Sequence, residues 1–148
     1  MDNNIIEFLG KQACASICCM DEHNSPWCFS CYFIFNPGEG LLYFKSSPGA
    51  NHASMMKKIP LIAGTVLPDK LNKLRVRGVQ FEGVVLDSMD RLTLGASQYY
   101  HRKNPLALAI PGEVWTIQVN HIKMTDSAMG FGKKITWSRQ SRFVVNNN

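Results

Sequence analysis

The residues best suited to hold an anion lie between Lys45 and His52. Lys45, Ser46 and Ser47 end a run typical of a strand, and His52 follows within the first turn of an expected helix. A lysine ammonium, two hydroxyls, an imidazole and the free N–H groups of a helix start could together surround a phosphate. The same residues also fit a plainer interpretation, in which the serines cap the helix and the lysine is solvated.

Five cysteines between positions 14 and 31 are a second group with possible chemistry. Cys28 and Cys31 have the spacing of redox and zinc motifs. A second pair for such a site could come from Cys14, Cys18 and Cys19. However, Cys28 and Cys31 lie in WCFSCYFIF, which is typical of a strand, and residues three apart on a strand point to opposite faces. We therefore predict buried thiols in a reducing cytoplasm and no metal site.

Hydrophobic patterning places these residues among short strands and three helices. A short first helix is expected in the run NNIIEFLGKQ, with an asparagine N-cap and Gly10 available to end it. The second should run from about Ala50 and stop before Pro60, and the third from a cap at Asp90 to about Lys103. Strands are expected over 14–20, 27–35, 41–45, 61–67, 73–86, 114–124 and 133–140, with Gly78 and Gly83 marking bulges or close approach of a ligand.

This order of elements predicts an α+β, mainly β fold. Six or seven mostly antiparallel strands should curl into one barrel, with helices covering its openings. The chain of 148 residues suits a single domain over 1–148 and can bury a core without disulfides.

Composition and charge bear on the class of partner. The net charge is +5, but the basic residues are scattered and no basic run is interleaved with aromatics, so we expect no nucleic-acid binding. A basic barrel that binds nucleic acid in a salt-dependent way is kept as an alternative. No apolar run approaches the roughly 20 residues of a membrane span, and the first residues lack the basic region of a signal peptide. We expect a cytoplasmic protein with no membrane association.

Several segments, taken together, resemble a known superfamily. They are WCFSCYFIF, the loop and helix from Ser46 to Pro60 with LIAGTV after it, RGVQFEG, VWTIQVNHIKMTD and, most specifically, GFGKKITW. The sequence resembles the flavin-binding split β-barrel proteins related to pyridoxamine 5′-phosphate oxidase, and within them the YhbP-like bacterial branch. The resemblance implies an FMN-binding split barrel that works as a homodimer, with flavin at the subunit interface.

The resemblance also implies which residues hold the cofactor. In the oxidase-like proteins a strand matching 28–32 runs along the isoalloxazine ring, a hydroxyl and a basic residue bind the phosphate, and the last strand contributes from the partner subunit. On this chain the implied ring contacts are Phe29, Ser30, Cys31 and Gln80. The phosphate contacts are Ser46 and His52, with Lys45 and Ser47 beside them, and the partner subunit supplies Lys133, Lys134 and Trp137.

Each of these residues also has a structural interpretation. Trp137 suits a core position, Gln80 an exposed strand position, and the lysine pair a solvated turn. Because the oxidase has an Arg-Lys pair where this chain has Asn51 and His52, phosphate binding should rely more on Lys45 and on the other subunit.

The end of the chain narrows the expected activity. The oxidases carry an Arg-x-His pair that holds pyridoxine phosphate, whereas this chain has WSRQSR from Trp137 and no histidine there. We therefore predict an FMN-dependent oxidoreductase with another, unidentified substrate, in which His101 and His121 are available as acid or base groups. A flavin carrier or sensor without turnover is the alternative, and FAD, haem and a deazaflavin stay open as cofactors.

Overall fold

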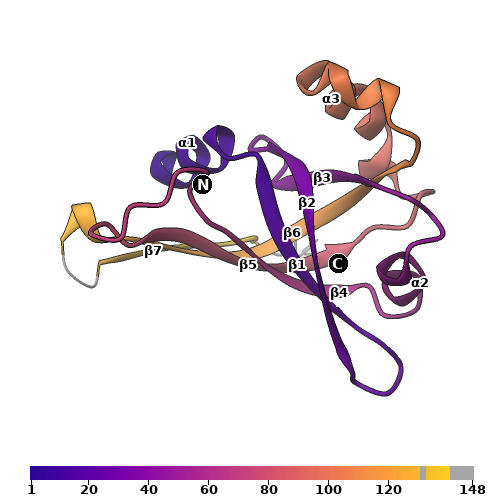
Figure 1. Ribbon diagram of the computed structural model, residues 1–148, viewed down its shortest axis with the longest axis horizontal. Helices are drawn as coiled ribbons and strands as arrows, with labels where there is room; N and C mark the ends of the chain where they lie inside the picture. Colours follow the sequence, from indigo (N-terminus) through magenta and orange to yellow (C-terminus); the bar gives the residue numbers. More distant parts are fainter. Residues whose placement is uncertain (131–132, 141–148) are drawn as a thin grey trace, which may run out of the picture.

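The computed structural model describes residues 1–130 and 133–140. Seven strands and three α-helices lie in this part of the chain (Figure 1). The helices are α1 (Asn3–Lys11), α2 (Asn51–Lys58) and α3 (Ala96–Lys103), with short 3-10 helices η1 (Arg91–Thr93), η2 (Pro105–Ala109) and η3 (Ser127–Met129). The strands are β1 (Cys14–Met20), β2 (Pro26–Asn36), β3 (Leu41–Ser46), β4 (Leu61–Val66), β5 (Arg77–Val85), β6 (Glu113–Asp126) and β7 (Lys134–Ser138).

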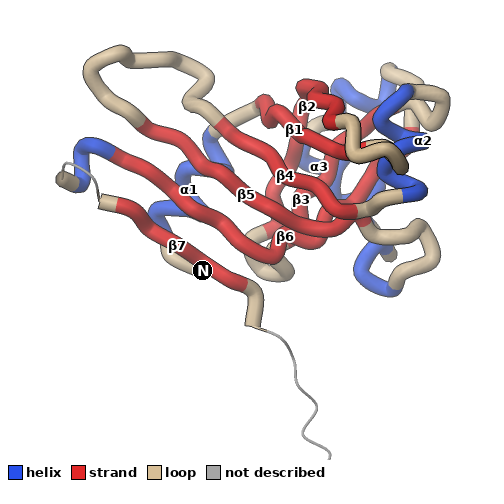
Figure 2. The backbone as a smooth tube through the Cα atoms, turned by 90° about the horizontal axis from the view of Figure 1, so that it is seen from below, coloured by secondary structure: helices blue, strands red, loops and turns tan. Residues whose placement is uncertain are grey.

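The seven strands form one antiparallel sheet in the order β3-β2-β1-β4-β5-β6-β7. Because β3 also pairs with β6, the first six strands close into a barrel. The first part of β6 pairs with β3 and its last part with β7, which extends the sheet beyond the barrel. Figure 2 shows β4, β5, β6 and β7 side by side. The predicted α+β, mainly β split barrel is confirmed.

Alternation along the strands puts one set of side chains inside the barrel. In β1, Ala15, Ile17 and Cys19 are buried while their neighbours are more exposed. Helix α1 adds its apolar face to the same interior, and α2 adds Met55 and Met56. The main core includes Ile5, Phe8, Ile17, Leu42, Phe44, Met56, Ile117, Ile122 and Met124.

A second, smaller core lies on the other face of β3. Leu41 and Tyr43 point away from the barrel interior and are covered by Ala96 and Tyr100 of α3 and by Ala107 of η2. Strand β3 is therefore buried on both faces, which explains its almost continuous apolar sequence.

Several helix boundaries differ from those predicted. Asp2, not an asparagine, caps α1 by accepting a hydrogen bond from Asn4 N at 2.8 Å, and α1 continues through Gly10 to Lys11. The helix predicted over 90–103 is two pieces, because Gly95 adopts φ +78° between η1 and α3. Asp90 caps the first piece, as expected, by accepting from Leu92 N.

Strand β5 starts at Arg77 rather than at residue 73, because a turn closed by Arg75 N to Asn72 O precedes it. The register of β5 on β6 shifts between Glu82 and Gly83, so the predicted bulge is present. A Cβ at Gly83 would lie 2.4 Å from Gln118 O. The glycine therefore allows close approach of a neighbouring strand.

None of the described helices has both the length and the apolar character needed to cross a bilayer.

Candidate functional site

The end of β3 and the start of α2 bring Ser46 and His52 into contact. Ser46 Oγ lies 2.6 Å from His52 Nε2. The imidazole stacks on Phe29 of β2, with ring centroids 3.7 Å apart and planes 9° from parallel. Burial lowers the pKa of His52, so the ring is neutral near pH 7. The structure thus assembles a hydroxyl and a neutral imidazole against an aromatic wall.

The first turn of α2 lies next to this pair. No side chain caps the helix, because its N-cap residue is Ala50. Ser47 accepts a hydrogen bond from Gly49 N at 3.3 Å and so stabilises the loop that leads to the helix. The uncapped start of α2 can offer backbone N–H groups to an anion beside Ser46 and His52.

Lys45 lies on the opposite face of β3, contrary to the expected grouping with Ser46. Its Nζ donates to Ala107 O at 2.7 Å and lies 3.1 Å from His101 Nε2. His101 Nδ1 is 2.8 Å from Ser97 O, so Nδ1 carries a proton and Nε2 accepts from the lysine. Successive strand residues point to opposite faces, and this alternation separates Lys45 from Ser46 within one chain. Lys45 and His101 instead hold η2 and α3 against β3.

A row of short polar side chains crosses the outer face of the sheet. The register pairs Ser30 with Ser16, Ser16 with Thr65, Thr65 with Gln80, and Gln80 with Lys123. The first four of these residues are exposed, and the hydroxyls of Ser16 and Ser30 are 3.3 Å apart. Such a surface could accept a flat ring and offer hydrogen bonds to its polar edge. Gln80 was predicted for this role from the sequence, whereas Ser16 and Thr65 were not, because only the register of β1 on β2 and β4 reveals them.

The three predicted β2 contacts do not share a face. Ser30 points outward, while Phe29 and Cys31 are half-buried and pack against the main core. Burial, reinforced by the nearby Cys14, raises the pKa of Cys31 to about 12. Cys31 is therefore an unreactive core thiol at neutral pH.

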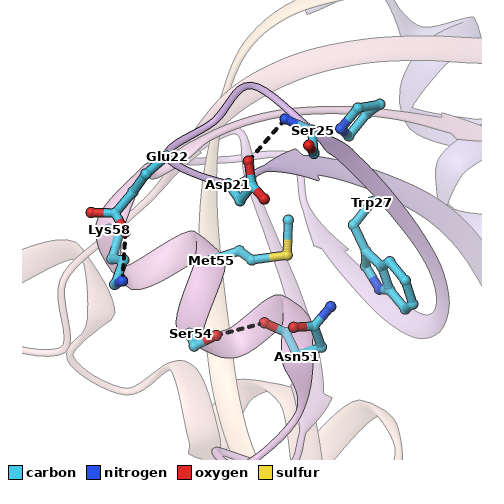
Figure 3. A pocket seen from close by; sticks show the side chains of 9 residues that line it. Asp21, Glu22, Ser25, Trp27, Asn51, Ser54, Met55 and Lys58 are labelled. Carbon is cyan, nitrogen blue, oxygen red and sulfur yellow. Dashed lines mark hydrogen bonds and ion pairs between the residues drawn. The ribbon is translucent and has the colours of Figure 1, made fainter.

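A cavity of about 250 Å³ adjoins the first turn of α2 on the side of the β1–β2 turn (Figure 3). Trp27 and Met55 supply apolar walls, and Asn51 lines the cavity from the helix start. An ion pair between Lys58 and Glu22, 2.7 Å apart, ties α2 to the turn. Since His52 follows Asn51, the cavity and the Ser46–His52 contact share one helical turn.

The predicted partner-subunit residues lie on β7 or directly before it. Strand β7 and α2 are at opposite sides of Figure 1. Lys133 and Lys134 are exposed, and Lys134 pairs with Thr125. Trp137 is half-buried against the main core, and the guanidinium of Arg139 lies 5.6 Å from its ring centroid. Within one chain the structure therefore does not bring these residues to Ser46 and His52.

No group of three or more His, Cys, Asp or Glu side chains in the described residues has a metal-binding arrangement. His121, the other candidate acid or base, lies beside Ser138, with Nδ1 2.9 Å from the hydroxyl oxygen.

The closed six-stranded antiparallel barrel, with a seventh strand on β6, defines the chain as a split-barrel protein. Solved structures with this fold include a heme binding protein from Mycobacterium smegmatis, with a TM-score of 0.72 at 13% identity over 88% of this chain and 55% of that chain. An FAD-binding protein from Mesorhizobium loti has a TM-score of 0.65 at 14% identity over 85% and 95% of the two chains. A NimC/NimA family protein from Clostridium acetobutylicum also has a TM-score of 0.65, at 14% identity over 92% and 90%. At these identities the likeness concerns the fold.

No family model matches the chain. Individual proteins do match it. A UPF0306 protein of Photorhabdus laumondii is 32% identical over 135 residues, which cover 91% of this chain and 94% of that protein. The UPF0306 protein YhbP of Salmonella schwarzengrund is 35% identical over 124 residues, 84% of each chain. The chain belongs to the UPF0306 (YhbP) family.

Proposed function

We propose that this protein binds FMN as a homodimer and uses it as an oxidoreductase on a small molecule. The observation that carries the proposal is the Ser46–His52 contact at the uncapped start of α2, joined through Phe29 to the strand that also presents Ser30. That a solved split-barrel protein is described as FAD-binding supports a flavin as the ligand.

The residues present fit the two halves of FMN. Ser46, His52 and the first N–H groups of α2 would hold the phosphate, because they combine a hydroxyl, an imidazole and helix-start donors. The isoalloxazine ring would lie against the outer sheet face, where Ser30 and Gln80 offer polar side chains. When bound, FMN supplies hydride or electron transfer.

Charge is the reason to propose a second subunit. A phosphate near neutral pH carries close to two negative charges, but within one chain the pocket offers only a neutral His52, since Lys45 is engaged on the other face. Lys133 or Lys134 of the partner subunit would supply the missing positive charge. A homodimer also suits an outer sheet face that exposes Tyr32 and Leu61.

The test is a titration with FMN and with riboflavin, which lacks the phosphate, followed by flavin fluorescence. Ser46→Ala should weaken FMN binding about tenfold to a hundredfold, equivalent to ~1.5–3 kcal/mol for a charge-assisted hydrogen bond, and leave riboflavin binding unchanged. Ser88→Ala, which alters an exposed serine elsewhere, is the matched control. Equal losses for both flavins, or no binding of either, would refute the pocket.

Two further measurements address the subunit and the activity. Sedimentation should show a dimer, and Lys133→Ala or Lys134→Ala should then lower the affinity for FMN. A protein that is a monomer at micromolar concentration would overturn the two-chain pocket. Reduction of bound flavin by NADH or NADPH, followed by reoxidation with an acceptor, would support an oxidoreductase. Stable binding without reduction would favour a carrier or sensor.

A further inference from the structure

Two cysteines on neighbouring strands face each other on the outer surface of the sheet. Cys18 of β1 and Cys28 of β2 are register partners, and their Sγ atoms are 2.8 Å apart. The other three cysteines lie opposite residues of other types: Cys14 opposite Tyr32, Cys19 opposite Trp27 and Cys31 opposite Ala15. The chain thus has one directly opposed cysteine pair in this hairpin.

The backbone hydrogen bonds of the hairpin define the kind of pair this is. Phe33 N donates to Ala13 O and Asp21 N donates to Ser25 O, at opposite ends of the β1–β2 ladder. Hydrogen-bonded and non-hydrogen-bonded pairs alternate in an antiparallel ladder, so Cys18 and Cys28 occupy a non-hydrogen-bonded position. Opposite residues there have Cα atoms about 4.5 Å apart, within the range of roughly 4.4–6.8 Å that a disulfide requires.

The surroundings of the two sulfurs differ. Cys28 is exposed, contrary to the buried thiol predicted from the sequence, whereas Cys18 is half-buried. The pKa of Cys18 is raised, first by its hydrogen bond with Cys28, then by burial and the Cys28 charge. Because Cys28 is exposed and Cys18 is half-buried, Cys28 is the sulfur that a small disulfide reaches first.

We propose that Cys18 and Cys28 form a reversible dithiol–disulfide site that exchanges with small-molecule disulfides. The thiolate of Cys28 attacks one sulfur of the small disulfide, forms a mixed disulfide and releases one thiolate. The Cys18 sulfur, losing its proton to the released thiolate, then attacks Cys28 Sγ and expels the second thiolate, which takes up from water the proton that Cys28 had lost. The net change is the protein dithiol plus one disulfide giving the protein disulfide plus two thiols, so the two electrons lost by the protein reduce the small molecule.

The bridge would lock β1 to β2 two residues away from Ser16 and Ser30 on the same face. Exposed disulfides are in general the more easily reduced ones, which suits a reversible site. The inference does not depend on flavin binding, because it uses only the geometry of the hairpin.

The experiment equilibrates the purified protein with mixtures of reduced and oxidised glutathione and measures intact mass after thiol alkylation. After alkylation the parent protein should carry two alkyl groups fewer as the oxidised form is raised and take up both again with excess reduced glutathione. It should also give a disulfide-linked peptide pair containing positions 18 and 28. Cys18→Ser should instead gain the mass of one glutathione that stays attached at Cys28. Cys14→Ser, which removes an exposed cysteine of the same strand face, is the matched control and should form the bridge like the parent.

Peptide mapping of the parent protein keeps the test independent of how well the variants fold. A bridge that maps to any other pair, or no bridge at any glutathione ratio, would overturn the proposal. So would loss of the bridge in the Cys14→Ser variant alongside normal folding, because the pairing argued from the register excludes Cys14.

Discussion

The carboxylate of Asp126 should be a main source of stability at the end of β6. It is 4% exposed and meets two guanidinium groups, with Arg77 Nε at 2.9 Å and Arg75 Nη2 at 3.3 Å. The N–H of Ala128 also donates to it at 3.0 Å. Asp126→Asn would keep this last bond and remove the charge that both arginines face.

The cost of this change follows from how exposed the arginines are. Breaking a fully buried ion pair costs ~3–5 kcal/mol. The cost is lower here because the side chains of Arg75 and Arg77 are 46% and 27% exposed, so water can solvate the two guanidinium groups once the carboxylate charge is gone. We expect Asp126→Asn to lower the free energy of unfolding by about 2–3 kcal/mol at pH 7. For a chain of this size the melting temperature should fall by about 5–10 °C.

The pH dependence of this loss has a defined sign. Burial alone would raise the pKa of Asp126, but the hydrogen bonds from Arg75 and Ala128 N and the charges of Arg77 and Arg75 outweigh it and hold the pKa below its ordinary value. A lowered folded-state pKa gives stability that is present above the unfolded pKa of about 3.9 and is lost as the pH falls through the folded value. The difference in the free energy of unfolding between the parent protein and Asp126→Asn should therefore become smaller as the pH falls below about 4.

Urea unfolding at several pH values, followed by tryptophan fluorescence, measures the effect. Asp87→Asn is the matched control, since Asp87 is exposed and accepts a hydrogen bond from Met89 N without an ion pair. It should change the free energy of unfolding by no more than about 0.5 kcal/mol. The reasoning would be refuted if Asp126→Asn lowered the free energy of unfolding at pH 7 by no more than the control does. It would also be refuted if the loss of unfolding free energy stayed constant down to the lowest pH.

Three other predictions follow from single residues. Gly83→Ala should lower the free energy of unfolding by about 1–3 kcal/mol in thermal unfolding, since its Cβ would meet Gln118 O at 2.4 Å. Gly10→Ala is the control: Gly10 lies within α1 and a Cβ there would meet no other atom, so this change should raise the free energy of unfolding by about 0.5–1 kcal/mol. A Gly83→Ala variant as stable as the parent would contradict the close approach of the two strands. Cys31, with its pKa raised to about 12, should resist iodoacetamide at pH 8 in the native protein, and early labelling in a peptide map would show that it is not buried. Burial lowers the pKa of His52 in the free protein, and an FMN phosphate in contact with the imidazole should raise it. FMN affinity should therefore increase as the pH falls from about 8 to 6.5, whereas riboflavin affinity should not. The same pH dependence in His52→Gln would show that the imidazole does not contact the phosphate.

Much of the local structure could be predicted because its causes are local. The strands over 14–20 and 27–35 and the helix that stops before Pro60 follow from alternation, turn residues and the rigidity of proline. The closeness of Ser46 and His52 was also predictable, since five residues of loop and helix start separate them. The opposite direction of Lys45 could have been read from the same strand alternation that correctly separated Cys28 from Cys31.

What the sequence could not determine is which strands lie side by side and in which register. Closure of the barrel through β3 and β6, and the row from Ser30 to Lys123, join positions that are far apart in the chain. The Cys18–Cys28 pair depends on the turn over 21–25, since a shift of the register by one residue would move each sulfur opposite another residue. Local propensities decide where strands begin and end, whereas the pairing between them is decided by burial of the whole core, and so only the tertiary structure shows which polar side chains meet.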